Sequence, residues 1–187
     1  MHNIFTDWRF LVRFFRKPAS IRNHDSGRVG LAKHTLDVAE NVLHLSRYKS
    51  KQFQDIAVAG ALLHDIGKII AYKKHKNAQH YYCPYINLVG HKYAGIKLFE
   101  KLTNKYDILP FKYKIIILNI LQGQHSTDYD YNMTEEAFYV KEADKLAAKM
   151  SVDFCSNSGV EYNKYLNRFV TSSELYLNKD YFPNILI

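Results

Sequence analysis

The sequence predicts an all-α protein, and two features lead to that prediction. Apolar residues recur at intervals of three and four in most segments of the chain, which is the spacing that places them on one face of a helix. The 187 residues are 47% hydrophobic and contain no low-complexity linker, so they suffice for one domain with a buried core. We therefore expect a bundle of helices around a single core.

The expected helices follow from this apolar periodicity. The first carries aromatic and aliphatic residues and ends before Pro18, and a loop then runs over residues 18–30. The next has an apolar face that includes Leu31 and Val38, and the one after it is rich in small aliphatic residues, which favours burial. The expected helices cover residues 3–16, 31–48, 52–66, 89–104, 110–123 and 134–152.

Two segments give a weaker signal. Residues 67–88 contain a glycine and a proline among many Lys, His and Tyr residues, and are expected to form an irregular loop. The chain from Ser156 onwards is rich in Tyr and Asn, and could be a packing arm, a terminal helix or the start of a further segment. We take residues 1–155 as one helical domain and residues 156–187 as an unassigned C-terminal arm that packs on it.

The charge balance is basic. The chain has 26 Lys and Arg residues against 18 Asp and Glu residues, which gives a net charge of +8 at pH 7. A basic surface attracts anionic partners such as phosphate esters and nucleic acids, and it can equally serve solubility alone. Basic and aromatic residues interleave over residues 73–82, a composition that fits either single-stranded nucleic acid binding or a solvated loop.

The chain has the features of a cytoplasmic protein. It contains no apolar run of about 18 residues, so no membrane-spanning helix is expected. Its N-terminal residues lack the apolar stretch and cleavage site of a signal peptide. Cys83 and Cys155 are far apart and match no disulfide or metal-binding framework, which fits a reducing compartment.

The segment GALLHDIGK, residues 60–68, holds a His–Asp pair in an apolar stretch. Burying His64 and Asp65 together costs free energy because both side chains lose water, and either a divalent cation or a mutual hydrogen bond could offset that cost. From the dipeptide alone the two alternatives are about even. Gly67 permits a helix end or a close approach of another backbone, and the ammonium of Lys68, one turn beyond Asp65, could meet a phosphate oxygen.

Two further polar residues lie on apolar helices elsewhere in the chain. His34 lies in LAKHTLDVAEN, and Asp144 lies in VKEADKLAAKM. Taken singly, His34 would more often be a core histidine and Asp144 a solvated helix acid. Together with the His–Asp pair they supply two imidazoles and two carboxylates from three helices. This set of ligands suits Zn²⁺, Mn²⁺, Fe²⁺ or Ni²⁺ and disfavours Ca²⁺.

The order His34 … His64-Asp65 … Asp144, with HDIGK at its centre, resembles the HD superfamily of metal-dependent phosphohydrolases over roughly residues 18–152. The segment PASIRNHDSGRVGLAKHT is similar to the start of the HD modules of bacterial 3′-to-5′ exoribonucleases and of some conjugation-associated proteins. Those modules share a PA-S/A start, a His-rich turn and then G-L-x-x-H-T. The resemblance implies an HD-domain helical bundle that holds one or two divalent ions, whether Mn, Fe, Zn, Ni or Mg.

The resemblance also assigns ligands. The residues it implies for a first ion are His34, His64, Asp65 and Asp144. Asp65 would be able to bridge two ions. His91 and His125 occupy the positions at which binuclear members bind a second ion, although as helix-start and helix-end residues both could instead be caps.

Two positions depart from the family pattern. Close relatives often carry a His-His pair where this chain has Gln124-His125, which puts full occupancy of a second ion in doubt. At the early turn, where the same relatives often carry two histidines, the chain has His24-Asp25. His24 could line a substrate pocket or lie in a surface loop.

The implied activity is hydrolysis of a phosphoester in a nucleotide or at a nucleic-acid end, by a metal-bound hydroxide. Asp65 and Lys68 would be the catalytic residues, and Lys68 and His24 would contact the substrate. The expected partner is a phosphorylated small molecule or a nucleic-acid end, including single-stranded nucleic acid. The alternative is a non-catalytic HD-fold module that binds a nucleotide or nucleic acid without turnover.

Overall fold

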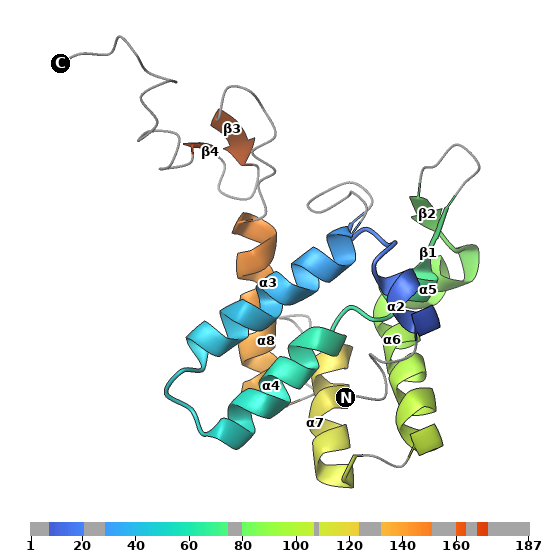
Figure 1. The fold of residues 1–187 in the computed structure, drawn as a ribbon, viewed down its shortest axis with the longest axis vertical. Helices are drawn as coiled ribbons and strands as arrows, with labels where there is room; N and C mark the ends of the chain where they lie inside the picture. The colour runs from blue at the N-terminus through green and yellow to red at the C-terminus, as the bar shows by residue number, and fades with distance from the viewer. Residues whose placement is uncertain are drawn as a thin grey trace, which may run out of the picture. The chain divides into compact units, whose positions relative to one another are not determined.

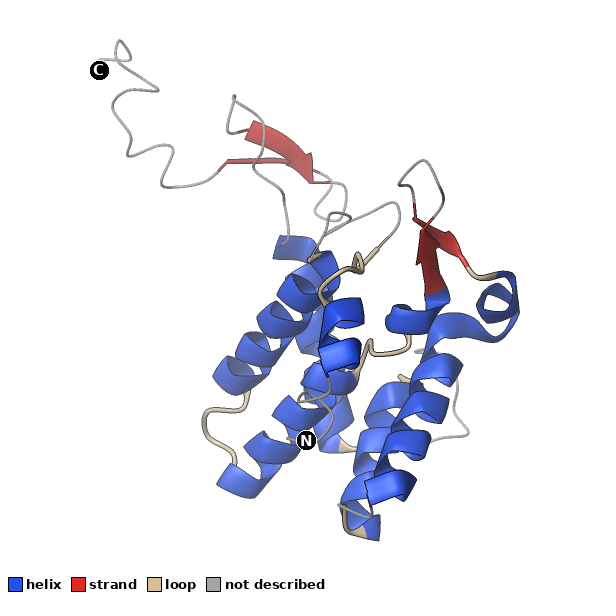
Figure 2. Cartoon of the chain, turned by 45° about the vertical axis from the view of Figure 1, so that its right-hand side comes forward, coloured by secondary structure: helices blue, strands red, loops and turns tan. Residues whose placement is uncertain are grey.

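The computed structural model describes residues 8–20, 29–74, 80–106, 109–123, 132–150, 160–163 and 168–171. The chain divides into two compact units, Met1–Ala148 and Lys149–Ile187. Nearly all described elements of the first unit are helices, as Figures 1 and 2 show, and the all-α prediction is confirmed. None of the helices in the described part of the chain has the length and apolarity needed to cross a membrane.

The helices lie close to the segments that the apolar periodicity predicted. In chain order they are α2 (Trp8–Phe14), α3 (Gly30–Leu45), α4 (Lys51–Leu63), α5 (Lys68–Ala71), α6 (Pro84–Tyr106), α7 (Phe111–Gln122) and α8 (Glu135–Met150). Of the first expected helix, residues 3–7 lie outside the described residues. The Ser50 hydroxyl accepts a hydrogen bond from the Phe53 backbone N–H, which caps the start of α4.

The main core is formed by apolar side chains from helices α2 to α8 and from the segment between α4 and α5. Its largest fully buried members are Leu31, Val38, Val42, Leu63, Ile66, Phe99 and Leu121. Helix α3 packs against α4, and α7 packs against both α4 and α6. The end of α4 is therefore surrounded by helices, and the His–Asp pair directly follows it.

Residues 67–88 differ from the irregular loop that the sequence predicted. They contain α5, an antiparallel hairpin of β1 (Tyr72–Lys74) and β2 (His80–Tyr82), and the start of α6. The base of the hairpin closes because Cys83 N–H donates to the Ala71 carbonyl at 2.8 Å and Tyr72 is buried against Ile86 and Ala94. The many Lys and His residues predicted solvent exposure correctly for Lys73, but three-residue strands are too short for their alternation to be recognised.

The described part of the second unit is a separate antiparallel hairpin. Strand β3 (Val160–Asn163) pairs with β4 (Arg168–Thr171), with Val160 opposite Thr171. This part of the expected C-terminal arm is therefore strand and not helix. The packing of the arm on the helical domain stays a prediction.

Candidate metal centre

His64 and Asp65 lie in a tight turn between α4 and α5, and not inside a helix as predicted. Helix α4 ends at Leu63. The turn that follows is held by backbone hydrogen bonds between residues three apart, from Ile66 N to Leu63 O at 3.0 Å and from Lys68 N to Asp65 O at 2.9 Å. The buried Leu63 and Ile66 are themselves three residues apart, a spacing that suits this tighter turn as well as an α-helix. The apolar pattern therefore could not show where α4 ends.

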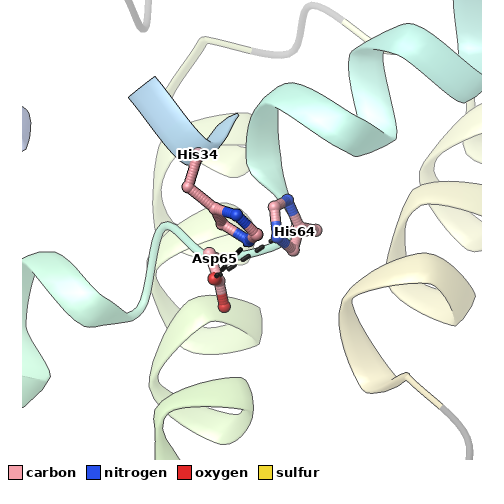
Figure 3. A group of neighbouring side chains, drawn as sticks. All are labelled: His34, His64 and Asp65. Carbon is pink, nitrogen blue, oxygen red and sulfur yellow. Dashed lines mark ion pairs between the residues drawn. The ribbon is translucent and has the colours of Figure 1, made fainter. Parts of the chain in front are cut away.

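The turn brings the pair against His34 from α3 and Asp144 from α8. His34 Nε2 lies 3.0 Å from Asp144 Oδ1 and 3.8 Å from Asp65 Oδ2. His64 Nε2 lies 3.3 Å from Asp65 Oδ2 and 3.8 Å from Asp144 Oδ1. Figure 3 shows both imidazoles directed at the Asp65 carboxylate. Four side chains from three parts of the chain thus direct their nitrogen and oxygen atoms at one small volume.

The distances between these atoms suit a divalent ion. Atoms bound to one ion by bonds of about 2.0–2.2 Å are separated by roughly 2.8–3.6 Å in octahedral or tetrahedral arrangements. Ligand atoms of His34, His64 and Asp65 all lie within 4.8 Å of one another, and the closest of the pairs above fall in that range. The residues present therefore fit the ion that the family resemblance implies.

His64 gives the most specific evidence of this fit. Its Nδ1 lies 2.7 Å from the Ala61 carbonyl oxygen, so that nitrogen carries the proton and donates it to the carbonyl. In the neutral ring Nε2 then carries a lone pair, and it is buried and makes no well-aligned hydrogen bond to the described residues, although Asp65 Oδ2 lies 3.3 Å away. A buried polar atom without a partner is costly unless a ligand satisfies it, and a metal-binding histidine is held in place by a hydrogen bond of this kind on its other nitrogen.

The electrostatics keep both carboxylates ionised. Burial by itself would raise the pKa of Asp65, but the Lys68 ammonium, His64 and His91 together hold that pKa well below its ordinary value. Burial acts in the same direction on Asp144, and its hydrogen bond with His34 and the charge of His64 lower its pKa. Burial disfavours protonation of His64, but the neighbouring Asp65 and Asp144 outweigh it and raise the pKa of His64. Both carboxylates are therefore ionised at neutral pH and available to a cation.

Lys68 is paired with Asp65. Its ammonium forms a buried ion pair with Asp65 Oδ2, one turn earlier in the chain, and only 11% of the Lys68 side chain is exposed. The sequence suggested a contact with a phosphate oxygen for this residue. In the structure the ammonium balances the charge of the Asp65 carboxylate, which both His34 and His64 approach within 4 Å.

His91 approaches the other oxygen of Asp65. Helix α6 is broken at Gly90, which has φ 80° and ψ 153°, so His91 begins its second part. His91 Nε2 lies 3.4 Å from Asp65 Oδ1, and its side chain is 30% exposed. Asp65 therefore faces His34 and His64 with Oδ2 and His91 with Oδ1.

Gly67 makes this approach possible because it has no side chain. A Cβ on Gly67 would lie 1.8 Å from the His91 carbonyl oxygen and 2.6 Å from the Gly95 backbone nitrogen. Gly95 meets Gly67 from the opposite side, so two glycines form the crossing between the turn and α6. The sequence predicted a close approach at Gly67, whereas the role of Gly95 was missed. One signal in the sequence could have pointed to Gly95. A glycine inside a helix costs about 1 kcal/mol relative to alanine, so its presence there suggests a packing role.

Two of the sequence-predicted site residues, His24 and His125, lie outside the described residues. The others divide into two groups around one carboxylate. His34, His64, Lys68 and Asp144 surround Asp65 on one side, and His91 lies at its second oxygen.

A helical bundle that holds a His-Asp pair between a histidine and an aspartate from other helices is the arrangement expected of an HD domain. The HD domain family matches residues 31–149, and the chain belongs to this family. This membership confirms the predicted resemblance. HD domains bind divalent metals, so it also supports a metal-dependent phosphohydrolase kind of function.

The chain is also similar to one curated protein, the 3'-5' exoribonuclease YhaM of Geobacillus sp. (strain WCH70). The two are 24% identical over 184 residues, which is 96% of this chain and 56% of that protein. The chain therefore spans little more than half the length of this relative. No solved structure gave a significant match to the chain.

Proposed function

We propose that the protein is a metal-dependent phosphohydrolase that cleaves a phosphoester at a nucleic-acid end or in a nucleotide. The observation that carries the proposal is the convergence of His34, His64, Asp65 and Asp144, in which His64 Nε2 is buried without a hydrogen-bond partner among the described residues. These four residues are the proposed ligands of a first divalent ion.

Two of the proposed ligands, His64 and Asp65, are held in place before an ion binds. The Ala61 carbonyl fixes the His64 ring, and the Lys68 ammonium fixes Oδ2 of Asp65. The low pKa of Asp65 keeps its carboxylate available to a cation at neutral pH. When bound, a divalent ion supplies positive charge to the phosphoryl oxygens and lowers the pKa of a water that can attack phosphorus.

The burial of the ligands indicates the direction from which a substrate approaches. The side chains of His34 and Asp65 are almost completely buried, whereas that of Asp144 is 45% exposed and that of His91 is 30% exposed. The open side of the centre therefore lies towards Asp144 and His91. A phosphoester entering there would meet Asp144 and the side of Asp65 that faces His91.

A nucleic-acid end is the substrate that we favour, and RNA is the first one to test. The relative named as a 3'-5' exoribonuclease aligns with almost the whole of this chain. The net charge of +8 favours a polyanion over a small neutral ester. Both observations support RNA without excluding a nucleotide, and a comparison of substrates separates the two.

The test is a hydrolysis assay with Mn²⁺ on short labelled RNA, short labelled DNA and a panel of nucleotides. We expect product from at least one of them, and we expect RNA to be the preferred substrate. His34→Ala should abolish turnover, whereas His44→Ala, an exposed histidine near the end of the same helix, should leave it unchanged. Tight nucleotide or RNA binding with no product under any condition would instead support a non-catalytic binding module.

A further inference from the structure

Lys92, the residue after His91, connects α6 to the end of α7. Its half-buried ammonium donates a hydrogen bond to the Gly123 carbonyl oxygen at 3.0 Å, across 31 residues of sequence. Gly123 is the C-cap of α7, and its N–H donates to the Ile120 carbonyl at 3.1 Å. A cation at this position is stabilised by the partial negative charge at the C-terminus of a helix.

Gly123 provides the space for this contact. A Cβ on Gly123 would lie 2.5 Å from Lys92 Nζ and 3.1 Å from Lys92 Cε, so any other residue would displace the ammonium. The backbone of Gly123 also has φ 52°, a conformation that residues with a side chain rarely adopt. Both partners are thus suited to one close contact between a side chain and a backbone carbonyl.

The second part of α6 needs such a contact at its start. Gly90 breaks the helix just before His91, and apart from the adjoining chain no atom lies within 4 Å of where a Cβ on Gly90 would be. The two parts of α6 are therefore not one continuous helix at His91. The start of the second part is fixed from the turn by the Gly67 crossing and from α7 by the Lys92 ammonium.

We propose that Lys92 is a positioning residue for the second-ion side of the centre. By holding Gly123, it keeps the start of the second part of α6 where His91 Nε2 faces Asp65 Oδ1 at 3.4 Å. This inference rests on the proposed function, since it holds that Lys92 increases the affinity for a second ion at the site that His91 and Asp65 would form. Lys92 acts through the backbone and does not contact an ion.

The experiment measures Mn²⁺ binding to the full chain by calorimetry, with electron paramagnetic resonance to detect magnetically coupled ion pairs. Lys92→Met removes the ammonium and keeps a side chain of similar length, and Gly123→Ala breaks the same contact from the other partner. Lys101→Met, an exposed lysine further along α6, is the matched control. Thermal melting of every variant without metal monitors folding.

We expect the wild type and Lys101→Met to bind two ions and to show the coupled signal. Lys92→Met should weaken the second ion by roughly 10-fold or more, the range found when residues supporting a ligand are removed, and should leave the first ion unchanged. Gly123→Ala should do the same, and the double variant should lose no more than either single one.

Unchanged second-ion affinity in Lys92→Met would overturn the inference and leave the proposed function standing. Loss of both ions together with a large drop in melting temperature would also overturn it, because Lys92 would then support the whole fold. If the wild type binds only one ion, the inference about Lys92 is wrong and the proposed function still stands. A wild type that binds none would remove the proposed function itself.

Discussion

His34 Nε2 lies 3.0 Å from Asp144 Oδ1, although the two residues are 110 positions apart in the chain. This contact joins α3 to α8, and the Asn41 amide adds a second one by donating to the Ala143 carbonyl at 3.5 Å. The His–Asp turn lies beside the first of these contacts, since His64 Nε2 is 3.8 Å from the same Asp144 oxygen. The helical core thus places the proposed first-ion ligands from distant segments close together.

Replacing Asp144 by Asn should weaken the first ion. The change keeps the shape of the side chain and its contact with His34, but it removes the charge that a divalent cation requires. We expect Mn²⁺ affinity to fall by more than about 100-fold, beyond the effect of supporting residues. Calorimetry measures this directly. Glu142→Gln is the control, because Glu142 lies on the same helix and pairs with Lys145 away from the centre. This variant should bind Mn²⁺ as the wild type does.

Replacing Gly67 by Ala should be strongly destabilising. Its Cβ would lie 1.8 Å from the His91 carbonyl oxygen, so α6 must move away from the turn. Overpacking of this kind costs about 1–3 kcal/mol, and urea unfolding without metal would detect it. Gly95→Ala should be milder, because its Cβ comes no closer than 3.3 Å to Gly67. Equal stabilities for Gly67→Ala and the wild type would show that the two backbones do not touch.

Replacing Lys68 by Met should destabilise the metal-free protein more than the metal-bound one. The change leaves the buried Asp65 carboxylate without its ammonium partner, which typically costs about 3 kcal/mol or more. A divalent ion beside Asp65 would offset part of that cost. Thermal melts with and without Mn²⁺ test this, and we expect the metal-induced rise in Tm to be larger for Lys68→Met than for the wild type. A smaller rise would indicate that Lys68 is needed to form the metal site.

The metal-induced stabilisation should grow as the pH rises from about 6 to about 8. The pKa of His64 is raised in the folded, metal-free protein, so its contribution to stability is present below about 6.5 and is lost as the pH rises through the folded pKa. A bound ion requires neutral His64, so it gains affinity over the same range. Asp65 and Asp144 have lowered pKa values, and their contribution is lost only in acid, as the pH falls through those values. Melts across this pH range with and without Mn²⁺ would show whether the difference in Tm increases.

Much of the fold could be predicted because long helices leave a strong apolar pattern. The segments carrying His34 and Asp144 were predicted as helices, and the structure has them in α3 and α8. What the pattern missed depends on tertiary contacts. The turn at His64 has the same three-residue apolar spacing as a helix. The hairpin at Tyr72–Lys74 is held by a small separate cluster that no local signal reveals.

The site was predictable in its residue types and not in its geometry. The similarity of HDIGK and its flanking residues to the HD superfamily pointed to the side chains that the structure brings together around Asp65, and their role as metal ligands stays a prediction. The roles of Gly95 and Lys92 arise from where α6 meets the turn and α7, and such crossings depend on helix packing that one sequence does not specify. The pairing of Lys68 with Asp65 was missed, because it becomes evident only when both residues are buried, and the expected contact of Lys68 with a phosphate oxygen stays a prediction.

The most direct test of the metal centre is a crystal structure of the Mn²⁺-loaded protein, with anomalous scattering recorded at the manganese edge. We expect a strong anomalous peak bound by His34 Nε2, His64 Nε2, Asp65 and Asp144, at distances of about 2.0–2.3 Å. The same data would show whether a second peak lies between Asp65 Oδ1 and His91. An absence of anomalous signal at these four residues at saturating Mn²⁺, with their side chains bonded only to one another, would contradict the proposed hydrolytic function.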